Sequence, residues 1–350
     1  MANEKFIQSK PLAEYCSKLF QAVGMPIEEA DLNADSLVEA DLTGVESHGV
    51  SRMPIYLKRI REKVVNPKCE IRLLRGAQAA GVFDACNSMG VSAAYRVMQH
   101  VLDKADQQGI AFFSAINSNH FGTAAYFAKM ALGRDMIGFS TTNSPARMAP
   151  WGGVEPYFGT NPFAVAIPAA EELPIVMDMA TSVVARGKIV LAARKNEAIP
   201  EGWALNNNGE STTDAKQALV GSVLPFAGAK GSAIALMIDT ICGILGGSRF
   251  GPGINDMYAD FTHPTFTSHV FAAIKISAFT PVESFKADTD RMIREIKQNR
   301  PASGVKEVYL PGEIEWRKRA ERLQNGIPVP AVILDDLKKE GALCDVACDL

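Results

Sequence analysis

The segment from Gly44 to Tyr56 places a histidine and an arginine, His48 and Arg52, four residues apart. In a helix, side chains at this spacing project from the same face. An imidazole can transfer a proton near neutral pH, and a guanidinium can bind a carboxylate through two parallel hydrogen bonds. The pair therefore suits an enzyme that acts on a small organic acid. The alternative is a helix start with Arg52 as a solvated charge, and Pro54 weakens the helical interpretation.

A second histidine, His120, lies in the segment Asn117-Ser-Asn-His-Phe-Gly122. A histidine that titrates near neutral pH can accept a proton from a substrate hydroxyl group and return it in the reverse direction. The alternative is a core histidine whose ring nitrogens are satisfied by the backbone. The second histidine favours a chemical role for His48 and Arg52, and the alternative for His120 itself stays open at this point.

Composition limits the class of protein. The chain has 350 residues, of which 47% are hydrophobic and 21% charged, as in ordinary globular enzymes built from two or three subdomains. A net charge of −3 leaves no basic surplus for binding nucleic acid.

The sequence shows no signal peptide and no apolar run long enough to cross a membrane, so we expect a cytoplasmic protein. The six scattered cysteines predict reduced thiols, and no residue spacing predicts a metal site.

Apolar spacing predicts a helical region at the N-terminus, from about Leu12 to Arg61, with a break near Pro26. Beyond residue 71, short strand-like runs alternate with helical ones, which indicates an α/β fold. The strand-like runs are 81–83, 110–116, 136–141, 175–178 and 270–276, and the main helical runs are 93–105, 121–132, 182–193, 229–245 and 283–297. A stretch rich in Gly, Pro and Asn, from 143 to 162, predicts a long structured loop of the kind that carries function.

Several common enzyme motifs are missing from the sequence. It contains no Gly-x-Gly-x-x-Gly fingerprint, no phosphate-binding P-loop and no Gly-x-Ser-x-Gly nucleophile elbow. A standard dinucleotide-binding fold, a P-loop nucleotide hydrolase and an esterase of this type are therefore disfavoured.

The motifs closely resemble those of the malate/L-lactate/ureidoglycolate dehydrogenase family, also called the sulfolactate dehydrogenase-like family. They occur in order from about residue 10 to residue 330 and include Gly44-Val-Glu-Ser-His-Gly-Val-Ser-Arg52, Asn119-His-Phe-Gly122, Pro150-Trp-Gly-Gly153, Gly159-Thr-Asn-Pro162, Asp178-Met-Ala-Thr181, Lys230-Gly231 and Pro311-Gly-Glu313. The resemblance implies a non-Rossmann α/β fold with a mixed sheet, plus an α-helical N-terminal region. It also implies a homodimer that uses NAD or NADP, with NAD favoured.

The resemblance implies a hydride transfer between nicotinamide and a small 2-hydroxy or 2-oxo acid. A reductase of a cyclic imine acid or of a diketo sugar acid is an alternative on the same scaffold, and a non-catalytic cofactor-binding protein is another. The implied domains are a helical domain at 1–72, joined by C-terminal helices at 313–350, a mixed α/β sheet domain at 73–125 and 265–312, and an NAD(P)-binding domain at 126–264.

The resemblance also assigns residue roles. His120, His48 and Arg52 are expected to be catalytic. The residues expected to bind the cofactor are Ser144, Asp178, Met179, Ala180, Lys188, Lys230, Gly312 and Glu313. Ser47 and Tyr56 are expected to contact the substrate. Apart from the resemblance, the charge of Arg147 close to the proposed pocket predicts that it reads a second acidic group of the substrate, with a solvated surface position as the alternative. Each has a structural alternative: Tyr56 suits a core, Asp178 and Glu313 suit helix starts, and the basic residues suit a solvated surface.

Overall fold

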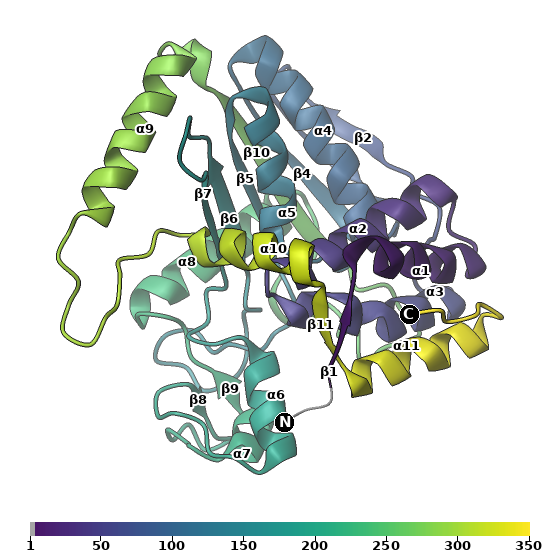
Figure 1. Ribbon diagram of the computed structural model, residues 1–350. Helices are drawn as coiled ribbons and strands as arrows, with labels where there is room; N and C mark the ends of the chain where they lie inside the picture. The colour runs from purple at the N-terminus through teal and green to yellow at the C-terminus, as the bar shows by residue number, and fades with distance from the viewer. Residues whose placement is uncertain (1–3) are drawn as a thin grey trace.

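A mixed seven-stranded sheet forms the centre of the protein (Figure 1). The computed structural model describes residues 4–350, and the side chains of all of these except Arg194. The strands lie in the order β2 (Arg72–Gly76), β3 (Ala80–Asp84), β4 (Ile110–Ser118), β10 (Thr267–Lys275), β5 (Met136–Thr142), β6 (Phe163–Ile167) and β7 (Ile175–Met179). Only β3 and β4 pair in parallel. The expected α/β fold with a mixed sheet is confirmed.

Helix α4 (Gly90–Gln108) makes the crossover between the two parallel strands and packs on the sheet. Its apolar residues recur every three or four positions, so one face of the helix is buried against β4 and β10. The short helix α5 (Ala124–Ala128) and a 3₁₀ turn, Lys129–Arg134, lie against β5 and β6. Phe113, Phe127 and Phe271 are completely or almost completely buried in this core.

A second hydrophobic core lies among the N-terminal helices α1 (Ser9–Ala22), α2 (Ile27–Leu42) and α3 (Met53–Arg61). The end of the chain returns to this core. Strand β1 (Glu4–Ile7) pairs antiparallel with β11 (Ile327–Pro330), and α11 (Ala331–Leu343) packs beside α3. Figure 1 shows α10 (Glu313–Asn325) running from the sheet toward this helical region.

A smaller lobe lies beside the sheet (Figure 1). It has its own apolar cluster. It contains α6 (Arg186–Lys195), α7 (Ala215–Val220) and the two-residue strands β8 (Ala204–Leu205) and β9 (Ser222–Val223). Helix α8 (Ala229–Asp239) continues into a π-helical turn, Thr240–Ile244, and α9 (Val282–Lys297) lies at the other end of the molecule. The sheet includes strands on both sides of residue 125, and the expected division into domains stays a prediction.

No helix within residues 4–350 is both long and apolar enough to span a bilayer.

Candidate active site

The segment with His48 and Arg52 is a pair of 3₁₀ turns and not the single helix that the spacing suggested. Glu46–His48 forms the first turn and Val50–Arg52 the second. Gly49 separates them in an extended conformation, with φ −85° and ψ −152°. Pro54 then lies in the first turn of α3, where its missing N–H has no helical partner to lose. We call residues 46–52 the His48–Arg52 turn.

The carboxylate of Asp41, at the end of α2, fixes the conformation of this turn. Its carboxylate Oδ2 accepts a hydrogen bond from the Val50 N–H at 2.8 Å. A Cβ at Gly49 would lie only 1.8 Å from Asp41 Oδ1, so the carboxylate occupies the space of any larger residue at this position. Burial raises the pKa of Asp41 to about 7, although the bond from Val50 opposes the shift. Within the turn, the Arg52 Nε–H donates to the Ser47 carbonyl at 2.6 Å.

The ring of His120 packs against the His48–Arg52 turn. Its Nδ1 lies 2.6 Å from the Tyr56 hydroxyl and 3.2 Å from the Gly122 backbone N–H. A backbone N–H can only donate, so we assign the lone pair to Nδ1, the neutral ring's proton to Nε2, and the donor role to Tyr56. The rings of His48 and His120 stack with centroids 5.4 Å apart. The structure thus brings together three of the residues singled out in the sequence.

The strand ends behind His120 hold it in place through polar contacts. Asn119 Nδ2 donates to the carbonyls of Asn87 and Ser88 at 3.2 and 2.9 Å. Phe121 stacks on His269 with centroids 4.5 Å apart and the planes nearly parallel. The His269 ring is completely buried, and its two nitrogens contact the hydroxyl groups of Thr142 and Ser118 at 2.8 Å each.

Burial keeps the imidazoles neutral. It lowers the pKa of His48 to about 3, and the nearby Arg52 charge adds to the effect. Burial and Arg52 also hold the pKa of His120 well below its usual range, although part of each ring remains open to solvent. Burial raises the pKa of Tyr56. At pH 7 the site therefore contains neutral rings, a protonated phenol and one guanidinium.

Arg59 and the Asp41 described above gave no signal in the sequence. Arg59 is 2% exposed, and its guanidinium donates to three backbone carbonyls, those of Met257, Asp260 and His263. It therefore anchors the loop that carries Tyr258, whose ring lies 5.6 Å from the Arg52 guanidinium. Because Arg59 stands among other basic residues in α3, its sequence context resembles a solvated helix face.

The end of β7, with Asp178, Met179 and Ala180, lies beside the segment that follows His120. Asp178 Oδ2 accepts from the Ala125 N–H at 2.8 Å, in the first turn of α5. Ser144 lies in the loop after β5, against Gly159, with its N–H donating to Asn161 Oδ1. The ends of β7, β5 and β4 lie at the same end of the sheet, and the segment after β4 carries His120.

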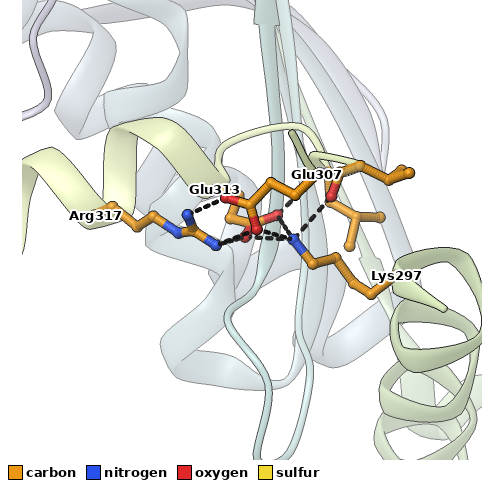
Figure 2. A network of polar contacts seen from close by, with 6 residues as sticks. Lys297, Glu307, Glu313 and Arg317 are labelled. Carbon is orange, nitrogen blue, oxygen red and sulfur yellow. Dashed lines mark hydrogen bonds and ion pairs between the residues drawn. The ribbon is translucent and has the colours of Figure 1, made fainter. Parts of the chain in front are cut away.

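Gly312 and Glu313 begin α10 beside β7. Gly312 packs on Val176, and a Cβ there would lie 2.8 Å from the Val176 carbonyl oxygen. Figure 2 shows the Glu313 carboxylate between Lys297 and Arg317, with Glu307 completing the network. Glu313 therefore fixes the start of α10 to the end of α9.

The remaining basic residues lie apart from the two histidines in sequence. Lys188 and Lys230 are exposed in the first turns of α6 and α8, and neither helix has a side-chain cap on its first N–H groups. A lysine at the positive end of a helix suits a phosphate group. The last two residues of β7, Asp178 and Met179, are exposed as well. Arg147 forms an ion pair with Asp256 in the loop that carries Tyr258.

Comparisons with known proteins agree along nearly the whole chain. The family described as malate/L-lactate dehydrogenase matches residues 7–338. A malate dehydrogenase of Pyrococcus abyssi is 37% identical over 341 residues, which cover 95% of this chain and 93% of the relative. The NAD(+)-dependent ureidoglycolate dehydrogenase of Escherichia coli K12 is 35% identical, with 92% and 90% covered.

Solved structures share the fold. The sulfolactate dehydrogenase from Methanocaldococcus jannaschii superposes with a TM-score of 0.91 at 34% identity, over 98% of each chain. The Δ1-piperideine-2-carboxylate reductase from Pseudomonas syringae gives a TM-score of 0.86 at 27% identity, over 96% of this chain and 99% of the other. With the family match, these likenesses show that the chain belongs to the malate/L-lactate dehydrogenase family.

Proposed function

We propose that this protein is an NAD(P)-dependent oxidoreductase that interconverts a small 2-hydroxy acid and its 2-oxo acid. The observation that carries the proposal is the cluster of His48, His120 and Tyr56 beside Arg52, in a chain of a dehydrogenase family. When bound, the nicotinamide cofactor supplies or accepts the hydride. The protein's own residues then have two tasks, which are to hold the acid and to move one proton.

Arg52 binds the substrate carboxylate, with Ser47 and His48 beside it. The His120 Nε2–H donates to the substrate oxygen and polarises the carbonyl group of a 2-oxo acid. As the oxygen gains charge, His120 gives up this proton at Nε2 and takes another at Nδ1 from the Tyr56 hydroxyl. After the hydroxy acid leaves, the Nδ1 proton returns to the Tyr56 oxygen and Nε2 takes up one proton from solvent. The contact of 2.6 Å between Tyr56 and Nδ1 supports this relay. Oxidation of the hydroxy acid runs through the same atoms in reverse.

The cofactor is proposed to lie along Ser144, Asp178, Met179 and Ala180. Its phosphates would point toward Lys188 and Lys230, and its adenosine half would lie beside Gly312 and Glu313. We propose NAD in preference to NADP. The support is that the relative named for NAD(+) is 35% identical to this chain. Titrating tryptophan fluorescence with NADH and with NADPH measures the preference, and tighter binding of NADPH would reverse it.

The test of the function is an absorbance assay of NADH and NADPH oxidation with a panel of 2-oxo acids. The panel contains pyruvate, oxaloacetate, 3-sulfopyruvate and oxalurate, so it spans monoacids and diacids. We expect cofactor-dependent turnover with at least one of them. Tight cofactor binding without turnover of any substrate in the panel or of a cyclic imine acid would favour the non-catalytic alternative.

The relay predicts an unusual pH dependence for reduction. Because the folded-state pKa of His120 lies well below 6.5, the ring is already neutral from pH 8 down to pH 6. We therefore expect kcat/KM for the 2-oxo acid to stay flat over this range. A free imidazolium donor would instead lose about tenfold in rate per pH unit above its pKa. A tenfold fall in kcat/KM between pH 7 and 8 would contradict the relay.

The relay also predicts the effect of removing the Tyr56 hydroxyl. Replacing Tyr56 with phenylalanine should lower kcat by about 10²-fold while the KM of NADH is kept.

A second candidate is reduction of a cyclic imine acid, favoured by the likeness to the Δ1-piperideine-2-carboxylate reductase. Both reactions need a bound carboxylate and a proton donor near the reacting atom. Turnover of the cyclic imine with a higher kcat/KM than any 2-oxo acid would select this candidate. The same assay decides between the two.

We also propose that the protein is a cytoplasmic homodimer. The exposed apolar side chains on α8 and just beyond it support a subunit contact there, because Leu236, Met237, Ile244 and Leu245 are each at least half exposed. Light scattering after size-exclusion chromatography should give twice the 37.7 kDa chain mass. A monomer at micromolar concentration would overturn the dimer.

A further inference from the structure

A polar cavity of about 170 Å³ lies between the loop after β5 and the lobe of α6 and α7. Two arginines, Arg147 and Arg186, are among the residues that line it. Pro156, Val220 and Gly221 form other parts of its wall. The space is large enough for a carboxylate or sulfonate group together with water.

The charges around this cavity do not balance. Asp256 pairs with Arg147, and its other carboxylate oxygen accepts from the Tyr258 N–H at 2.9 Å. Arg186 donates only to a neutral group, the Leu219 carbonyl at 3.1 Å. Among the side chains that the structure describes, no carboxylate lies within ion-pair distance of Arg186. Burial, and then the nearby charge of Arg147, lowers the pKa of Arg186, although the charge of Asp256 opposes the shift. The cavity therefore has two positive groups and one negative group.

The cavity adjoins the His48–Arg52 turn at two points. Gly187, the residue after Arg186, lies so close to the turn that a Cβ on it would be 4.0 Å from Ser47 Cβ. On the other side, Tyr258 connects Asp256 to Arg52, because its N–H bonds to Asp256 and its ring faces the Arg52 guanidinium. The start of α6, which carries Arg186, therefore lies against the turn that carries Arg52.

We infer that Arg186 and its cavity bind a second acidic group of the substrate, a carboxylate or a sulfonate, while Arg52 binds the first. This inference rests on the proposed function and names its substrate class as a 2-oxo or 2-hydroxy diacid. Arg147, which the sequence suggested for this role, is already neutralised by Asp256 and acts by positioning the loop of Tyr258.

The first test compares Arg186→Gln with Arg291→Gln, which removes an equal charge from the exposed face of α9. For Arg186→Gln we expect kcat/KM with oxaloacetate or 3-sulfopyruvate to fall at least about tenfold, mainly through KM, because a charge-assisted bond is lost. With pyruvate the fall should be below about twofold, and Arg291→Gln should change neither. An equal fall for diacids and monoacids overturns the inference, as does no fall. If kcat/KM falls only when NADPH is the cofactor, and equally for diacids and monoacids, a cofactor phosphate occupies the cavity and the inference is also overturned.

The second test needs no turnover. Succinate and butyrate have the same carbon chain and differ in one carboxylate, so their thermal stabilisation of the protein can be compared directly. Succinate should raise the Tm of the wild-type protein more than butyrate does, and Arg186→Gln should remove the difference. If the protein reduces pyruvate but succinate shows no advantage, only the inference fails. If succinate binds through Arg186 and no 2-oxo acid is reduced, the proposed function fails and the diacid site stands.

Discussion

Replacing His120 with alanine is expected to lower kcat by about 10²- to 10⁴-fold, the usual contribution of a positioned proton-transfer group. The residue holds a proton on Nε2 and accepts from Tyr56 at Nδ1, so its loss removes both the donor to the substrate oxygen and the path that replaces the proton. The dissociation constant of NADH, measured by fluorescence titration, should change by less than about twofold.

His100 offers the matched control for this variant. It lies on α4 with its ring edge-on to Phe83 and Phe113, away from the His48–Arg52 turn. His100→Ala should keep kcat near that of the wild-type protein, even where it lowers the Tm. Normal turnover in His120→Ala, or an equal loss in both variants, would show that His120 is not the proton-transfer residue.

The sequence was sufficient for the fold class, and it singled out His48 and His120, whose rings stack in the structure. Strict apolar spacing in α4 and α9 and short apolar runs at β4, β5 and β10 predicted elements that the structure contains. His120 was found from its motif. Its contact with Tyr56, 64 residues earlier in the chain, depends on how α3 packs against the end of β4. Local sequence patterns carry no information on contacts between residues so far apart in the chain.

Other elements escaped prediction for physical reasons. Strand β6 has a short apolar sequence, Phe163–Ile167, that follows directly on a loop rich in turn formers, so neither its length nor its boundary was marked. Strands β1 and β11 pair across more than 320 residues, and each is only four residues long. The stability of such strands comes from the partner and the core beneath, which no local window of sequence contains.

The charged residues behind the site were the least predictable. Asp41 and Arg59 look like ordinary polar positions of helices, and both are almost completely buried. Each is buried because it binds backbone groups of a distant or irregular segment, the Val50 N–H in one case and three carbonyls of the Tyr258 loop in the other. The only local hint at Asp41 is the glycine eight residues later, which leaves room for the carboxylate.

That glycine gives the second prediction with a large effect. In Gly49→Ala the added Cβ would fall 1.8 Å from Asp41 Oδ1, far closer than the sum of the van der Waals radii of carbon and oxygen. Either Asp41 or the turn must move, and both changes break the bond from the Val50 N–H. We expect the free energy of unfolding to fall by about 1–3 kcal/mol, as for other overpacked sites, when measured by urea denaturation. We also expect kcat/KM for the 2-oxo acid to fall at least about tenfold, because Arg52 and His48 shift together.

Gly133→Ala is the control, since a Cβ there meets no atom within 4 Å and the change should stay within about 0.5 kcal/mol. A double-mutant cycle then tests the cause of the loss at Gly49. In an Asp41→Ala background the carboxylate is gone, so the added methyl group has space and should cost less than it does in the wild-type protein. The same cost in both backgrounds would mean that Asp41 does not set the conformation of the His48–Arg52 turn. A smaller cost, with KM for the acid still raised by Asp41→Ala alone, would mean that the buried carboxylate holds the substrate-binding arginine in place through one backbone bond.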